Sequence, residues 1–286
     1  MNDFLYSRFV ETVHRLALGI EPVDAQGRRR LSYDLQVAPD ILPIDLPRPP
    51  LERHASNRYS LRYQPGVKTP VDLRFFDSAN TPYRPQSDRR RVVPRRLRIP
   101  ILTLADVEAQ EQAEAAADKK PKDFKRRIRR PVFYPGAAYS FDASSTGLRG
   151  RVIRDDKPMR WARIVATLAG ETVVVGRAHG DDRGEFLLLI NSLVTSGSAM
   201  AKPLRIQVSV FGPASVPTPA SPDLPQADPL WDLPLETLAN PGLDDPVANG
   251  DTLPNQPPLN YTASVSRVVE FTLGKCLHGE EDFVIT

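Results

Sequence analysis

The chain has 286 residues, 41% of them hydrophobic, and a formal net charge of +3. Its 29 prolines are about twice the ordinary share. Because proline interrupts helices and central strands, this composition argues against an all-helical or doubly wound α/β fold. No apolar run approaches the roughly 20 residues that span a bilayer, and the N-terminus lacks the basic region of a secretory signal. We therefore expect a cytoplasmic protein with no membrane span.

The charge is divided unevenly along the chain. Residues 1–132 contain 26 Lys and Arg against 17 Asp and Glu, a balance of +9, whereas residues 133–286 contain 12 against 18, a balance of −6. Such a chain can contact acidic surfaces at one end and basic surfaces at the other, including copies of itself. The high pI is therefore not by itself a sign of nucleic-acid binding.

Residues 1–20 carry a helical pattern. The apolar residues at this spacing are Phe4, Leu5, Phe9, Val13 and Leu16. They predict an amphipathic helix over residues 3–18, with Gly19 as its stop. Such a helix could dock onto its own domain or, through Phe4, Leu5 and Phe9, onto a neighbouring subunit.

Residues 21–102 are predicted to form a first β unit. Apolar and polar residues alternate with period two in four segments, at residues 31–37, 59–63, 71–75 and 97–101. Residues 38–53 contain five prolines and predict an extended segment along a surface.

Residues 103–132 are interpreted as a charged linker or insertion between two β units. Thr103 is placed to cap a helix over residues 104–118, which has few large apolar residues and should be exposed. A basic run follows at residues 119–130, with eight cations in twelve residues. Two interpretations stay open: a solvated linker, or a seat for phosphates or an acidic partner formed by Arg126, Arg127, Arg129 and Arg130.

Residues 133–286 are predicted to form a second β unit. Its expected strands are residues 148–154, 160–168, 172–178, 185–190, 204–211 and 263–273. Short strands joined by tight turns, with no helices between them, indicate an antiparallel β-sandwich of the immunoglobulin or transthyretin type. The fold class is therefore mainly β, with two antiparallel units.

A recognisable motif order lies in the second unit. A Gly150-Arg151-Val152 strand is followed by a turn at Pro158, a strand of small residues at 162–166 and an Asp-x-x-Gly-x-Phe hairpin. In that hairpin Asp181 can bond the turn amides, Gly184 can supply a positive φ and Phe186 begins a buried strand. This order resembles the carboxypeptidase regulatory-like domain, a transthyretin-like sandwich, over residues 147–211 and 263–273. The resemblance implies an accessory or binding module that brings no catalytic residue.

A proline-rich arm interrupts the second unit at residues 213–258. It holds twelve prolines, seven acids and no Lys or Arg, a composition that cannot form its own core. It also holds an apolar cluster, Leu230, Trp231, Leu233, Leu235 and Leu238. The arm could bind a partner, with Trp231, Leu233 and Leu235 as anchors, or fold back onto its own domain.

The sequence predicts no enzyme, no cofactor and no metal. None of the four histidines stands in an HxxxH or HxH pair, and P-loop, GxGxxG and nucleophile-elbow motifs are missing. His179 with Asp181 and Asp182 is the one local cluster, and a hairpin explains it without chemistry. Cys276 is expected to be a packing residue.

These observations favour a structural or adaptor protein of a large assembly, whose partners are other protein subunits, including copies of itself. The architecture resembles accessory proteins of contractile phage-tail-like injection particles, which implies a cap, collar or baseplate-associated component. One alternative is a sandwich that binds carbohydrate or a surface polymer, with Trp161 as the candidate contact. The other is nucleic-acid or acidic-partner binding through residues 119–130.

Overall fold

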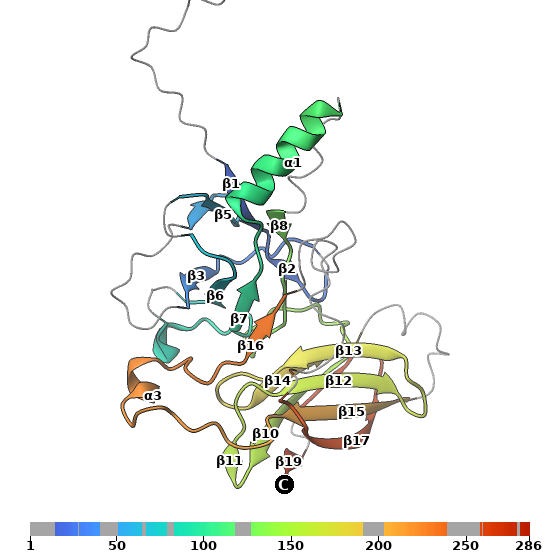
Figure 1. Ribbon diagram of the computed structural model, residues 1–286. Helices are drawn as coiled ribbons and strands as arrows, with labels where there is room; N and C mark the ends of the chain where they lie inside the picture. The colour runs from blue at the N-terminus through green and yellow to red at the C-terminus, as the bar shows by residue number, and fades with distance from the viewer. Residues whose placement is uncertain are drawn as a thin grey trace, which may run out of the picture.

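The computed structural model is mainly β, as the sequence predicts, and its strands form two units linked by the arm (Figure 1). It describes residues 15–27, 29–40, 51–64, 67–78, 83–117, 127–190, 203–238, 258, 260–278 and 281–286. Four of the residues expected to bind a partner, Phe4, Leu5, Phe9 and Arg126, lie outside the described residues.

The first unit contains two four-stranded sheets and a strand pair. One sheet has the order β4 (Glu52–His54), β5 (Arg58–Arg62), β1 (Leu16–Ile20), β8 (Ile128–Arg129). The other has the order β16 (Leu235–Thr237), β7 (Arg95–Ile99), β6 (Val71–Phe76), β3 (Gln36–Pro39). The pair is β2 (Val23–Asp24) with β9 (Val132–Phe133). Three of the four predicted alternating segments become β5, β6 and β7, because each buries every second residue in one core. In the fourth, the strand starts only at Gln36, although Leu31 and Leu35 are buried as expected.

The predicted N-terminal helix is wrong at its described end, where Leu16–Ile20 forms β1. This strand pairs antiparallel with β5 and parallel with β8, so neighbours bond its backbone on both sides. Leu18 and Ile20 are buried in the core of the first unit. Tertiary pairing outweighs helical spacing here, as it commonly does for short segments. Residues 1–14 lie outside the described residues.

The predicted exposed helix is confirmed as α1 (Leu104–Ala116), which projects from the first unit in Figure 1. Thr103 and Asp106 form a capping box at its start, and Val107 is its one fully buried residue. No described helix is long and apolar enough to cross a membrane. The linker boundary at residue 132 is wrong, because β8 and β9 return to the first unit and pair with β1 and β2. Their two-residue length gives no periodicity to detect.

The second unit is a sandwich of two sheets around one core. One sheet has the order β13 (Val174–His179), β12 (Arg163–Leu168), β15 (Leu204–Gly212), β17 (Ala263–Phe271). The other is built on β10 (Gly147–Arg154), which pairs with β11 (Lys157–Pro158), β14 (Glu185–Leu189), β18 (Cys276–Leu277) and β19 (Phe283–Ile285). All six predicted strands are present. The structure adds β11, β18 and β19, which are too short to leave a pattern in the sequence.

The Asp-x-x-Gly-x-Phe hairpin has the geometry predicted for it. The Asp181 carboxylate accepts hydrogen bonds from the backbone N–H groups of Arg183 (2.8 Å) and Glu185 (3.0 Å). Gly184 has a φ of +73°, and a Cβ there would meet the Val152 carbonyl oxygen at 2.5 Å. Phe186 is buried in the sandwich core. Each residue of the motif therefore has a local structural role.

The arm folds back onto its own chain between residues 213 and 238. After a short helix, α3 (Leu224–Ala227), it adds β16 to the first unit, parallel to β7. Leu230 and Leu233 lie in a third core, between the units, which also contains Phe76, Tyr83, Val93 and Trp161. The expectation that Leu233 anchors a partner is therefore wrong, since its side chain is buried inside the chain.

Trp161 also corrects a prediction, because it is only 2% exposed. Strict alternation would place it on the face opposite Ala162, but residue 161 has a φ of +60° and precedes the strand that begins at Arg163. This turn brings Trp161 and Ala162 inward together. The indole Nε1–H donates to Asp232 at 2.8 Å. Trp161 is thus a junction residue and offers no face to a carbohydrate.

We predict that Gly184→Ala destabilises the chain more than Gly170→Ala. Both glycines have positive φ, which costs alanine about 1 kcal/mol, but a Cβ at Gly170 meets nothing within 4 Å. The clash at Gly184 should add about 2 kcal/mol, measured as the shift in the free energy of urea unfolding. Equal losses in the two variants would contradict the tight approach described for this hairpin.

Candidate functional site

The candidate site is the junction between the two units, and a buried ion cluster lies at its centre. The carboxylate of Glu236 in β16 forms ion pairs with Arg95 of β7 at 2.5 Å and with Arg163 of β12 at 3.0 Å. The three residues come from the arm, the first unit and the sandwich. Burial alone would raise the pKa of Glu236, but the two guanidinium groups outweigh it and hold the pKa below its usual value. Glu236 is therefore a carboxylate that neutralises cations from both units.

His179 lies beside this cluster, at the end of β13. Its ring stacks on Tyr134, with centroids 3.9 Å apart and an interplanar angle of 25°. Burial, and then the charges of Arg163 and Arg95, hold the pKa of His179 well below its usual value. The imidazole is therefore held in its neutral form, and its packing on Tyr134 extends the junction.

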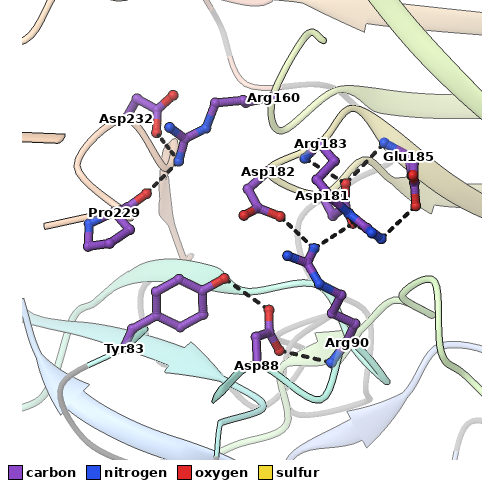
Figure 2. Close-up of polar contacts among 10 residues, drawn as sticks. All are labelled: Tyr83, Asp88, Arg90, Arg160, Asp181, Asp182, Arg183, Glu185, Pro229 and Asp232. Atoms are coloured by element: carbon purple, nitrogen blue, oxygen red, sulfur yellow. Dashed lines mark hydrogen bonds and ion pairs between the residues drawn. The ribbon is translucent and has the colours of Figure 1, made fainter. Parts of the chain in front are cut away.

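Arg90 makes a second contact between the units (Figure 2). Its guanidinium reaches across to the sandwich hairpin, 3.1 Å from Asp181 and 2.7 Å from Asp182. Asp181 also receives the guanidinium of Arg183 at 3.2 Å. The Asp181–Asp182 pair thus closes its own turn and binds the first unit. This is a use of the hairpin that the sequence does not reveal.

Asp88 holds Arg90 in place from the other side. Its carboxylate accepts the backbone N–H of Arg90 at 2.9 Å and the hydroxyl of Tyr83 at 2.9 Å (Figure 2). Burial raises the pKa of Asp88 to about 6. Burial likewise raises the pKa of Tyr83, helped by the neighbouring carboxylates Asp88 and Asp182. Asp88 is therefore a junction carboxyl whose pKa is raised toward neutrality by burial.

The arm is fastened by every acid it carries between residues 227 and 237. Asp228 forms an ion pair with Arg74 of β6 at 2.7 Å, and Asp232 forms one with Arg160 at 3.1 Å. Glu236 pairs with Arg95 and Arg163. Arg160 also donates to the carbonyl of Pro229 (Figure 2). These cations belong to the same chain, so part of the basic charge elsewhere in the sequence is neutralised by acidic residues of the arm. Of the residues expected to anchor a partner here, Trp231 and Leu235 remain half-buried.

The described part of the basic run is also engaged within the chain. Arg127 is 3.1 Å from Glu111 of α1, and Arg130 is 3.4 Å from Glu21. Arg129 is fully buried and donates to the carbonyls of Ile128 and Pro100. The expectation that Arg129 binds an acidic partner is therefore wrong. A basic run in the sequence need not form a basic surface, because its arginines can form ion pairs with neighbouring carboxylates or donate to backbone carbonyls.

The arrangement is chemically suited to holding segments together. Across the described residues, no group of three or more His, Cys, Asp and Glu side chains is placed to hold a metal ion. Cys276 is half-buried in β18, and burial raises the pKa of its thiol. His54 and His278 are exposed, and His14 lies outside the described residues. Sequence reasoning missed the contacts of Arg90, Arg95, Arg163 and Glu236, because their partners are far apart in the chain. It also missed Asp88, whose partners Tyr83 and Arg90 are near in sequence but form no recognised motif.

Comparison with known proteins found no matching family model, curated protein or solved structure.

We predict that Glu236→Gln lowers the free energy of unfolding by about 3 kcal/mol, because it removes the buried carboxylate charge that pairs with both Arg95 and Arg163. The measurement is urea unfolding followed by tryptophan fluorescence. Glu270→Gln is the matched control, since Glu270 lies on β17, exposed and 3.9 Å from Arg205, and should change stability by less than about 0.5 kcal/mol. Similar losses in both variants would show that Glu236 does not hold the junction.

We predict that Asp88→Asn becomes more stabilising, relative to the wild type, as the pH rises from 4 to 7. Because the folded-state pKa of Asp88 is raised to about 6, its contribution is present at low pH and is lost as the pH rises through that value. Asparagine keeps the acceptor for Arg90 and cannot ionise. The difference between the two unfolding free energies should change by about 2 kcal/mol across this range; a difference that does not vary with pH would refute the assignment.

Proposed function

We propose that this chain is a non-enzymatic structural or adaptor protein that joins or caps subunits of a large assembly. The main support for the proposal is the buried ion cluster at the junction between the two units. Glu236, Arg95 and Arg163 bind three segments of the chain to one another in a buried cluster. The charged side chains brought together at the junction are used to fix the placement of two β units. A protein that sets the spacing of its neighbours needs such fixed placement.

The free surfaces support the same role. α1 projects from the first unit with most of its surface exposed. At the other end, β17 has β15 as its one hydrogen-bonded neighbour among the described strands. Its outward side chains are Ser264, Ser266, Val268 and Glu270, all exposed. An edge strand of nine residues offers backbone groups that a partner strand can pair with.

The finer proposal is a cap, collar or baseplate-associated component of a contractile phage-tail-like injection particle. It draws on the transthyretin-like motif order around Gly150, Asp181, Gly184 and Phe186, with the two-sheet sandwich built on those residues as its support. The carbohydrate-binding alternative loses its candidate contact with the burial of Trp161. The nucleic-acid alternative is weakened because Arg129 is buried, and because Arg127 and Arg130 form ion pairs with Glu111 and Glu21.

The proposal is tested by sedimenting a lysate of the natural producer through a density gradient. We predict that the full-length chain travels with particles of megadalton size. It should stay there after nuclease and mild detergent treatment, because the contacts are between folded proteins. Sedimentation near the 31.8 kDa of the free chain would overturn the proposal. Loss of the fast fraction on nuclease treatment would point to nucleic acid instead.

A further inference from the structure

An apolar groove opens at the end of the first unit where α1 begins. Its volume is about 460 Å³. One wall is the segment after β5, with Tyr63 and Val67, and the other leads into the helix, with Ile101 and Leu104. Leu104 is 41% exposed, which is unusual for a large apolar side chain in this structure. Since covering apolar surface stabilises by about 25 cal/mol per Å², a segment seated there would gain from every apolar side chain it buries.

The chain enters the first unit at this groove. The backbone N–H of Tyr63 donates to the carbonyl of Arg15 at 3.0 Å. The guanidinium of Arg15 lies 2.8 Å from Glu108 and 3.2 Å from Glu111, both on α1. Arg15 therefore contacts Tyr63, which lines one wall, and the helix that continues from the other wall. Because β1 and β5 are antiparallel, the N-terminal end of β1 lies beside the C-terminal end of β5, where the groove-lining segment with Tyr63 and Val67 begins.

The sequence before Arg15 has the side chains that such a groove would bind. Residues 1–14 lie outside the described residues, and they contain Phe4, Leu5, Phe9 and Val13. Phe9 is six positions from Arg15, so its reach is at most about 20 Å. We infer that the groove binds the N-terminal segment of its own chain, with Phe9 among the side chains that cover Leu104. This goes beyond the proposed function, because it assigns the segment to an intramolecular site.

The test is disulfide trapping in the full-length chain with Cys276 replaced by serine. Phe9→Cys is combined with Leu104→Cys in the groove. The matched control combines Phe9→Cys with Arg62→Cys, a side chain exposed to a similar degree, 45%, that lies opposite Leu16 in β5. Arg62 lies opposite Leu16, the residue after Arg15, and Leu104 lies one helical turn before Glu108, which binds Arg15, so an unbound tether can reach both second sites. A seated segment should form the monomeric Phe9–Leu104 disulfide about tenfold faster, because binding raises one effective concentration and not the other.

Each other outcome overturns the inference. Equal rates for the two pairs would mean that the segment is not held in the groove. A Phe9–Leu104 disulfide that joins two chains would mean that a second copy supplies the segment. If a cysteine variant fails to fold, the cycle of Phe9→Ala and Leu104→Ala gives an independent answer, since the losses in unfolding free energy should not add. Sedimentation of the wild type tests the proposed function separately.

Discussion

The fold depends on one carboxylate, Glu236, that is shared by two guanidinium groups from different units. Arg95 and Arg163 are each about 95% buried or more, and the arm supplies a carboxylate that pairs with both of them. Removing two such cations from water is costly, and a buried pair stabilises only when its geometry and hydrogen bonds are complete. The acidic arm provides that geometry, so the relative placement of the two units follows from the position of β16.

The arm therefore joins the two units, although its composition is typical of a segment without a fixed structure. Proline and acidic residues without a compensating cation are typical of disordered segments, yet here Asp228, Asp232 and Glu236 each bind an arginine that lies elsewhere in the chain. Leu230 and Leu233 add an apolar contact between the units. The segment gains order from the surfaces it joins and has little core of its own.

Local patterns predicted local structure well. Period-two alternation located β5, β6 and β7, and the spacing of tight turns located the six main strands of the sandwich. The turn chemistry of Asp181 and Gly184 was also correct. Prediction failed where distant residues decide the outcome. Leu16 continues a helical spacing but begins a strand that pairs with two others. Trp161 turns inward at a positive φ, and Arg129 is buried and donates to backbone carbonyls. The junction could not be predicted, because no periodicity connects Arg95 with Glu236.

The distance along the chain between these two residues has a consequence for synthesis. Glu236 follows Arg95 by 141 positions, so at ordinary elongation rates the arginine waits on the order of 10 s for its counter-ion. Until then the first unit lacks its edge strand β16 and the carboxylate that this strand brings to Arg95. A nascent or truncated chain that ends before Glu236 therefore lacks both the edge strand and the ion cluster that join the two units.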